Sequence, residues 1–411
     1  MKVLVTGGAG FIGSHLVDAL LARGHTVRVL DVLDPQVHGP KREPPAYLNP
    51  AAEFQVGDVR DHAAVRRALD GVEVVFHEAA AVGVGQSMYE IERYVSVNTL
   101  GAAVLLEELV EHRAQLRRVV VASSMSIYGE GAYRTKPEGS AGTKPEGSAG
   151  TKPEGSAGTK PEGSAGMKPE VSAGSSEGAL VFPRLRSDEQ LEARRWDHED
   201  ASGRALEAAP TPESKPLAPT SVYAVTKRDH EELFLAVGAA YAIPTVALRY
   251  FNVYGTRQSL SNPYTGVIAI FSSRLLNGRA PVLFEDGRQS RDFTHVSDIV
   301  AANLLAMERD AAVGGVYNVG TGRATSVLEI AETLAREIGV TEAAEVVGRF
   351  RAGDIRHCYA DVAAAARDLG FEARVSLEAG MRELLAWLRT QSAEDRVDQA
   401  RKELESRGLT R

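Results

Sequence analysis

MKVLVTGGAGFIGSHLVDALLARGHTVRVLD, residues 1–31, is the stretch that decides the fold. A short β-branched run, Lys2 to Thr6, predicts a strand, and a predicted helix at 13–23 and a second strand at 26–31 follow it. The turn between strand and helix holds Gly7, Gly10 and Gly13. Glycine lets the backbone turn tightly and approach a pyrophosphate, while the helix N-terminus offers unpaired N–H groups to phosphate oxygens. The stretch therefore predicts a dinucleotide-binding unit.

The acidic residue that ends the second predicted strand indicates which dinucleotide is bound. A carboxylate at Asp31 can hold the hydroxyls of the adenosine ribose and would repel a 2′-phosphate. The sequence thus favours NAD over NADP as the cofactor.

Strands and helices continue to alternate beyond this unit. Further strands are predicted at 53–56, 72–77, 118–123 and 245–250, and helices at about 98–112 and 222–240. Strands separated by helices imply crossover connections and a parallel sheet, and their nearly continuous apolar runs indicate burial on both faces. The predicted fold is α/β, a Rossmann-type doubly wound parallel sheet with a smaller C-terminal α/β substrate-binding domain. We assign 1–134 to the first part of the NAD-binding domain, 216–390 to its completion interleaved with the substrate-binding domain, and 391–411 to a charged C-terminal helix.

A repeat interrupts this pattern. The octad TKPEGSAG occurs four times in tandem from Thr135, and a fifth, degenerate copy, MKPEVSAG, ends at Gly174. Each octad lacks a large apolar side chain and is rich in Gly, Pro and Ser, a composition typical of disordered or extended linkers. We therefore predict that 135–215 is a disordered insertion in a loop, with a candidate helix near 187–195. A docking repeat for a partner is the alternative.

Composition and charge restrict the partners. The formal net charge of −8 does not indicate a basic face for binding nucleic acid or an anionic membrane, so we expect a small-molecule partner. The single cysteine, Cys358, excludes an internal disulfide and a cysteine-rich zinc site, and we expect no metal. No apolar run is long enough to span a bilayer, and the N-terminus does not resemble a signal peptide. We expect a cytoplasmic protein.

Three residues could carry acid–base chemistry. Tyr223 and Lys227, in SVYAVTK, are four residues apart at the start of a predicted helix and share one face of it. A free tyrosine has a pKa of about 10, and a neighbouring ammonium would favour its phenolate. Ser124 follows the buried strand in RRVVVASSMSIYG, at the strand end where ligands bind in doubly wound sheets. Its hydroxyl could orient a substrate oxygen toward Tyr223.

Together these motifs resemble the extended short-chain dehydrogenases, in particular the NAD-dependent nucleotide-sugar epimerases and dehydratases of the UDP-galactose 4-epimerase group. The resemblance covers 1–134 and 217–388 and includes VGDVRD, HEAAAV, VNTLG, YFNVYG, RDFTHVSDIV and RAGDIRH. It implies a tightly held, recycled NAD bound by Gly7, Gly10, Phe11, Ile12, Gly13, Asp31, Asp58, Val59, Ala79, Ala80, Ala81, Asn98, Tyr223 and Lys227. It implies a nucleotide-diphosphate sugar bound by Ser124, Ser126, Asn252, Arg291 and Arg351, and a homodimer formed through the predicted helices at 98–112 and 222–240.

A narrower resemblance, to bacterial dTDP-L-rhamnose 4-epimerases, is carried by LDPQVHG, AAAVGVGQSMYEI and SSMSIYGEG. It implies that Tyr223 takes the proton of the sugar 4-hydroxyl while hydride passes to NAD, that Ser124 holds the developing carbonyl, and that hydride returns to the opposite face. Relatives of that branch carry a cysteine-containing segment where this chain has repeats, so a metal is not expected there.

Several alternatives stay open. UDP-glucose/UDP-galactose and UDP-glucuronate are alternative substrates, and a nucleotide-sugar 4-ketoreductase is an alternative enzyme. A 4,6-dehydratase is disfavoured because Met125 and Ser126 stand where such enzymes carry an Asp-Glu pair, and Ser126 argues likewise against a decarboxylase. A non-catalytic protein that binds NAD or sugar is the alternative from another class. The presence of both Tyr223 and Lys227 argues against it.

Overall fold

The computed structural model describes residues 1–135, 179–259, 266–341, 344–351, 353–390 and 405–410. Its centre is a seven-stranded sheet in the order β14-β9-β5-β4-β1-β2-β3, in which every neighbouring pair is parallel. The strands are β1 (Lys2–Thr6), β2 (Thr26–Asp31), β3 (Glu53–Val56), β4 (Val74–His77), β5 (Arg118–Ser124), β9 (Thr245–Tyr250) and β14 (Val316–Val319). The predicted doubly wound α/β fold is confirmed.

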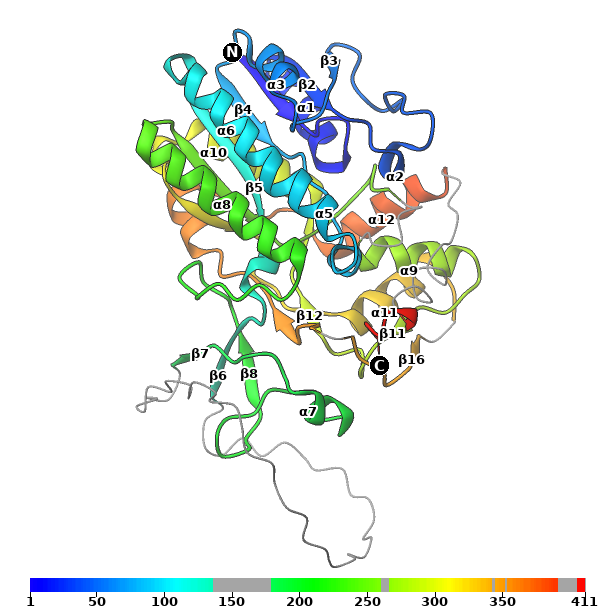
Figure 1. The fold of residues 1–411 in the computed structure, drawn as a ribbon. Coiled ribbons are helices and arrows are strands. Elements are labelled where there is room, and N and C mark those ends of the chain that lie inside the picture. The colour runs from blue at the N-terminus through cyan, green and yellow to red at the C-terminus, as the bar shows by residue number, and fades with distance from the viewer. Residues whose placement is uncertain (136–178, 260–265, 342–343, 352, 391–404, 411) are drawn as a thin grey trace, which may run out of the picture.

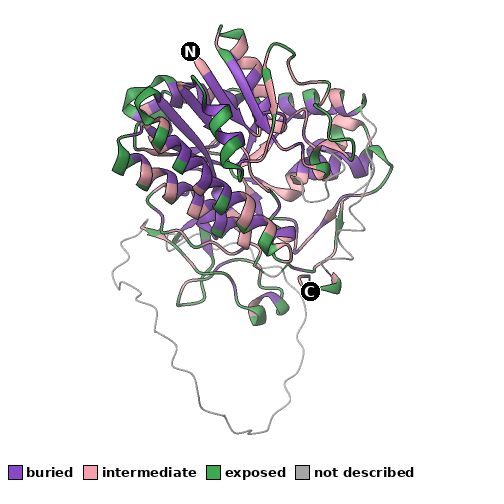
Figure 2. Ribbon diagram, turned by 45° about the horizontal axis from the view of Figure 1, so that its top comes forward, coloured by how far each residue is buried: buried purple, intermediate pink, exposed green. Residues whose placement is uncertain are grey.

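Helices cover both faces of this sheet (Figure 1). Because side chains alternate along a strand, Val3 and Val5 of β1 pack with α1 (Phe11–Ala22) and α10 (Val296–Glu308) on one face. Leu4 packs on the other face with α3 (His62–Leu69), α6 (Gly101–His112) and α8 (Val222–Tyr241). Figure 2 shows the strands buried beneath helices whose outer sides are exposed. This burial on both faces explains the nearly continuous apolar runs.

A smaller C-terminal part packs below the carboxyl edge of the sheet. Its core lies between α9 (Val267–Leu276), α11 (Val327–Ile338) and α12 (Leu377–Leu388). Short strand pairs accompany these helices: β10 (Asn252–Tyr254) with β13 (Phe293–His295), β11 (Val282–Leu283) with β16 (Glu345–Val346), and β12 (Ser290–Arg291) with β15 (Thr325–Ser326) and β17 (His357–Cys358). Outside the insertion and the strand before it, the remaining described elements are α2 (Pro35–His38), α4 (Val84–Ser87), α5 (Ile91–Tyr94), π-helices at Val95–Leu100 and Ala365–Leu369, and 3-10 turns at Arg113–Gln115, Met125–Tyr128 and Asp310–Ala312.

The prediction of disorder over 135–215 is wrong for residues 179–215. They contribute β7 (Leu180–Val181), α7 (Asp188–Glu192) and β8 (Leu206–Ala209), and β7 and β8 flank β6 (Ala132–Thr135) in an antiparallel sheet (Figure 1). The candidate helix near 187–195 is α7, which is shorter than predicted. The repeats from 136 onward and most of the predicted C-terminal helix, 391–404, lie outside the described residues.

A buried ion pair fixes this ordered part of the insertion. Arg186 Nη1 lies 2.8 Å from Glu285 Oε2, and the Arg356 guanidinium lies 3.0 Å from the same oxygen. Buried charges of opposite sign that also hydrogen-bond hold one arrangement, because separating them would leave an uncompensated charge. The partners come from segments far along the chain, so the polar local composition gave no sign of this order.

Candidate active site

A cavity of about 570 Å³ opens at the carboxyl edge of the central sheet, beyond β1, β2, β4, β5 and β9. Ligands of open α/β sheets bind in this position. Of the predicted site residues, those that line the cavity are Gly7, Gly10, Phe11, Ile12, Gly13, Asp31, Asp58, Val59, Ala79, Ala80, Ala81, Ser124, Ser126, Tyr223, Lys227 and Asn252. Asn98, Arg291 and Arg351 do not line it.

The glycine turn brings two loops of the cavity wall close together. Gly7 has a φ of +69°, and a Cβ atom built on it would lie 2.8 Å from the backbone nitrogen of Ala79. A Cβ on Gly13 would lie 2.3 Å from the carbonyl oxygen of Gly7. Helix α1 begins at Phe11, so Gly13 lies in its first turn, and no side chain caps its N-terminus. The first N–H groups of the helix are therefore available to a ligand.

Asp31, at the end of β2, lines the cavity beside the glycine turn. Its Oδ2 accepts a hydrogen bond from the Ala9 N–H at 3.0 Å, and its Oδ1 accepts one from the Leu33 N–H at 2.8 Å. The carboxylate thus ties the glycine turn to the end of β2. Asp58, after β3, is held by Arg60 at 2.6 Å.

Asn98 supports the cavity wall from behind. Its Oδ1 accepts a hydrogen bond from the Ala81 N–H at 2.8 Å, and its Nδ2 donates to the Ala81 carbonyl at 3.1 Å and to Thr226 Oγ1 at 3.0 Å. The side chain is fully used by these bonds and is buried. Asn98 therefore positions the 79–81 loop against α8, and the structure does not support direct contact with a ligand.

The acid–base residues meet at the same cavity. Ser221 caps α8 by accepting a hydrogen bond from the Ala224 N–H at 3.1 Å, so Tyr223 and Lys227 lie in the first turns of the helix. Burial raises the pKa of Tyr223, and a hydrogen bond with Ser124 opposes that rise. Burial lowers the pKa of Lys227 to about 8, against the opposing charges of Glu78 and Glu231. The Lys227 ammonium donates to the carbonyl oxygen of Ala122.

Ser124 has a second set of contacts that fixes its hydroxyl. Its Oγ accepts a hydrogen bond from the Ser126 N–H at 3.2 Å and lies 2.9 Å from Ser126 Oγ. It thereby caps the short 3-10 turn Met125–Tyr128. Ser126 reaches the cavity beside it and orients Ser124 through this contact.

Asn252 is a further predicted substrate contact that reaches the cavity. Its backbone N–H donates to the Asp292 carbonyl at 2.8 Å, while its side-chain Oδ1 is buried without a hydrogen-bond partner among the described residues. A buried polar atom without a partner costs free energy unless a ligand or water satisfies it. The orphaned oxygen therefore fits a ligand-binding role.

The two arginines predicted to bind the nucleotide-diphosphate sugar are engaged elsewhere. The Arg291 guanidinium donates to the carbonyl oxygens of Ser290 and Ile355, each at 2.8 Å, and reaches Asp354 at 3.2 Å. Arg351 stacks on the ring of Phe284, with its guanidinium carbon 4.2 Å from the ring centroid. The motifs located the backbone of these residues, but neighbouring acceptors and an aromatic ring set the direction of the side chains.

Known proteins share this arrangement over nearly the whole chain. A model of the NAD dependent epimerase/dehydratase family matches residues 3–149 and 202–320. The dTDP-L-rhamnose 4-epimerase of Burkholderia thailandensis is 34% identical over 389 residues, which cover 94% of each chain. The chain belongs to the NAD-dependent epimerase/dehydratase family.

Solved structures agree with this membership. The UDP-glucose 4-epimerase of Thermotoga maritima, crystallised with UDP-glucose, superposes with a TM-score of 0.70 at 28% identity and covers 95% of this epimerase and 99% of its own chain. The UDP-glucose 4-epimerase of Thermus thermophilus, in complex with NAD, gives a TM-score of 0.66 at 28% identity, with 95% and 100% covered. The predictions of an enzyme and of NAD as its cofactor are confirmed.

The helices in the described part of this epimerase include none with the length and apolar character of a membrane span.

The cavity of this epimerase fits NAD. The glycine turn leaves only backbone between the first loop and the 79–81 loop, the uncapped N–H groups of α1 suit a pyrophosphate, and Asp31 offers a carboxylate at the end of β2. When bound there, NAD supplies a hydride acceptor and donor. Tyr223, Ser124 and Lys227 would hold its reacting end beside the substrate.

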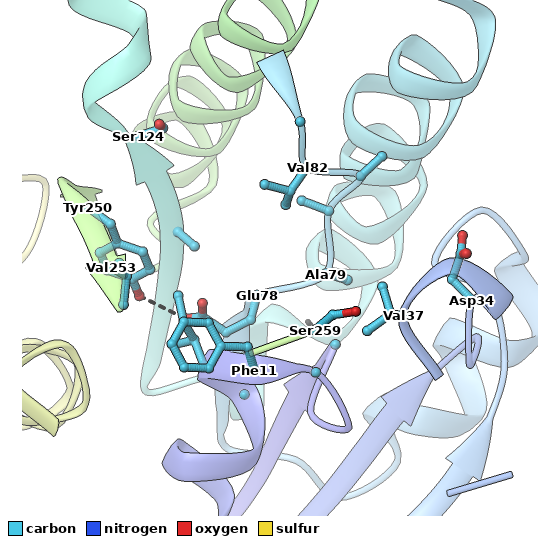
Figure 3. A pocket seen from close by; sticks show the side chains of 18 of the residues that line it. Phe11, Asp34, Val37, Glu78, Ala79, Val82, Ser124, Tyr250, Val253 and Ser259 are labelled. Carbon is cyan, nitrogen blue, oxygen red and sulfur yellow. Dashed lines mark hydrogen bonds between the residues drawn. The ribbon is translucent and has the colours of Figure 1, made fainter. Parts of the chain in front are cut away.

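Sequence reasoning missed other polar residues of the cavity of this epimerase. Glu78 and Tyr250 line it and hydrogen-bond to each other at 2.8 Å (Figure 3). Arg257 and Gln258 also line it, and each has a buried polar atom without a partner among the described residues. A sequence signal existed for Glu78 and Tyr250, because Glu78 directly follows a predicted strand and Tyr250 ends one at the carboxyl edge of the sheet.

Proposed function

We propose that this epimerase interconverts dTDP-L-rhamnose and its 4-epimer, dTDP-6-deoxy-L-talose. The observation that supports epimerisation is that Ser124, Tyr223 and Lys227 line one cavity. Met125 and Ser126, which also line it, stand where a dehydratase would carry an acid–base pair. Neither side chain can supply the titrating groups that elimination of water needs. The likeness to the Burkholderia enzyme, at 34% identity over nearly all of both chains, supports the choice of sugar.

The chain's own groups move one proton and hold one oxygen. The Tyr223 phenolate accepts the proton of the sugar 4-hydroxyl as the carbon is oxidised, and returns it after the sugar has turned. The Ser124 hydroxyl donates a hydrogen bond to the carbonyl oxygen of the 4-keto sugar. The Lys227 ammonium lies one helical turn from Tyr223 and stabilises the phenolate. Asn252 holds the diphosphate end during the turn. Arg291 and Arg351 contact the nucleotide diphosphate after their side chains turn away from Ile355 and Phe284.

The purified protein, without added cofactor, tests this proposal. We incubate it separately with dTDP-L-rhamnose and UDP-galactose and resolve the sugar products by chromatography. Conversion of dTDP-L-rhamnose to a mixture with its 4-epimer, and no conversion of UDP-galactose, is the expected result. Conversion of UDP-galactose alone would move the enzyme to the UDP-sugar branch. No conversion of either, even after NAD is added, would contradict the 4-epimerase proposal for both substrates.

We also propose that two copies of the chain associate through α6, α8 and the helical segments before α6. Ile91, Val95, Leu100 and Val225 are large apolar residues at exposed positions on these neighbouring elements, and α6 and α8 lie side by side on the outer face in Figure 1. Contiguous exposed apolar side chains favour association. Light scattering should give a dimer for the native chain and a monomer for Leu100→Glu. The matched control is Val346→Glu, equally exposed at 51% on β16, which should stay dimeric. A monomeric native chain, or a dimeric Leu100→Glu variant, would contradict this interface.

A further inference from the structure

Glu78 is a carboxyl group of the cavity that the proposed mechanism does not use. It follows β4 directly, its backbone N–H donates to the Thr6 carbonyl at 3.2 Å, and its side chain is half-buried. It lines the same cavity as Tyr223 and Lys227. In Figure 3 the dashed line joins the Glu78 carboxyl group to the Tyr250 hydroxyl. The charge of a carboxyl group at this position influences any ligand group that binds beside Tyr223 and Lys227.

The hydrogen bonds around Tyr250 make Glu78 an acceptor. Asn303 Nδ2 donates to the Ile299 carbonyl at 2.9 Å and lies 2.7 Å from Tyr250 Oη, so helix α10 sets the orientation of the amide. The Tyr250 hydroxyl has one proton. Asn303 Oδ1 lies 3.0 Å from it, whereas Glu78 Oε1 lies at 2.8 Å and is the acceptor that can carry charge. This network anchors Oε1, and no described residue hydrogen-bonds to Oε2, which is left for the cavity.

Few charged groups near Glu78 influence the pKa of its carboxyl group. Burial raises the pKa of Glu78 to about 7, while the Tyr250 hydrogen bond and the Lys227 charge lower it. On the neighbouring elements, burial lowers the pKa of His77 to about 3 and that of His230 well below its usual value, so both imidazoles are neutral. Burial raises the pKa of Tyr250 and Tyr223, and both are phenols at neutral pH without ligand. Among the described residues, the charge that acts on Glu78 is thus the Lys227 ammonium.

We propose that the Glu78 carboxylate makes the cofactor cavity favour oxidised over reduced NAD. The nicotinamide ring carries a positive charge in NAD⁺ and none in NADH. Hydride transfer requires the ring to lie beside the carbon whose hydroxyl Tyr223 deprotonates, and therefore within the field of both Lys227 and Glu78. The ammonium disfavours a cationic ring, and the carboxylate offsets that repulsion. A 4-epimerase needs this bias, because every turnover starts from oxidised cofactor and loss of the keto sugar would leave the enzyme reduced.

The ratio of the affinities for NAD⁺ and NADH measures this bias directly, without any sugar. Bound NADH is followed by its fluorescence and displaced with NAD⁺ from cofactor-free protein, at pH values from about 6 to about 8. In the native chain the ratio should rise with pH, because Glu78 loses its proton over this range. In Glu78→Gln the ratio should be lower by about tenfold at the upper pH, and its rise between about pH 6 and about pH 7 should be lost, because Lys227, whose pKa is about 8, changes charge only at the upper end of the range.

Two further variants keep the test decisive. Tyr250→Phe retains the carboxyl group but removes the hydrogen bond that lowers its pKa, so the rise in the ratio should move to higher pH. Asp34→Asn removes a carboxylate that lines the cavity beyond β2 and should leave the ratio unchanged, since Asp34 pairs with Arg93 and the carboxylates that act on Lys227 are Glu78 and Glu231. An unaltered ratio and pH dependence in Glu78→Gln would overturn the proposal, and if that variant does not fold, an unshifted Tyr250→Phe profile would. The inference rests on NAD as the cofactor, and because no sugar is present, failure of the proposed epimerisation would not alter its outcome.

Discussion

Replacing Tyr223 by Phe should lower kcat by about 10²- to 10⁴-fold, the contribution typical of a positioned acid or base. The change removes one oxygen atom, the group that exchanges a proton with the sugar hydroxyl, and leaves the ring in place against Tyr94. Because Lys227 and the glycine turn are unaltered, the variant should retain its NAD. The measurements are turnover of the nucleotide sugar and the NAD content of the purified protein.

Tyr241→Phe is the matched control for this substitution. Tyr241 lies at the other end of the same helix and is 49% exposed, so the loss of its hydroxyl should change neither kcat nor NAD content. Native turnover in Tyr223→Phe would remove Tyr223 from the mechanism and favour a protein that only binds its ligands. Joint loss of NAD and turnover would assign the hydroxyl a structural role.

Most of the sheet could be predicted from the sequence because its inner strands are buried on both faces. β1, β2 and β9 begin and end as predicted, and so does the edge strand β3, which is exposed at both ends, whereas β14 was not predicted. β4 begins two residues later than predicted, at Val74. Residues 179–215 could not be predicted in the same way, because what orders them is the pairing of Arg186 with Glu285, a residue 99 positions away. Local composition contains no information on such a pair.

The candidate site likewise contains residues that could be placed from the sequence and residues that could not. Residues placed by backbone position, such as the glycines, Ser124 and Tyr223, line the cavity as predicted. Arg291 and Arg351 are long side chains whose direction depends on acceptors and rings supplied by other segments, so their motifs could not locate the guanidinium groups. Tyr250 looked like the last residue of a buried strand, and its pairing with Glu78 becomes visible only when β4 and β9 end at the same edge.

Replacing Gly7 by Ala should weaken NAD binding by about 10- to 100-fold, which corresponds to the roughly 1–3 kcal/mol that overpacking typically costs at about 1.4 kcal/mol for each factor of ten. The added Cβ would lie 2.8 Å from both the nitrogen and the Cα of Ala79. Both neighbours are backbone, so the clash can be relieved only if the glycine turn and the 79–81 loop move apart. These loops form facing walls of the cofactor cavity, and titration with NAD measures the effect.

Gly24→Ala is the control that distinguishes backbone strain from the steric clash at Gly7. Gly24 follows α1 with a φ of +79°, close to the +69° of Gly7, but a Cβ built on it meets nothing within 4 Å. Gly24→Ala therefore introduces the same left-handed strain, which should lower the free energy of unfolding by about 1 kcal/mol, and it should leave NAD affinity unchanged. Equal NAD affinity in the two variants would mean that the close approach of Gly7 to Ala79 is not what shapes the cavity. A defect confined to Gly7→Ala would identify that approach as the reason why this position needs glycine.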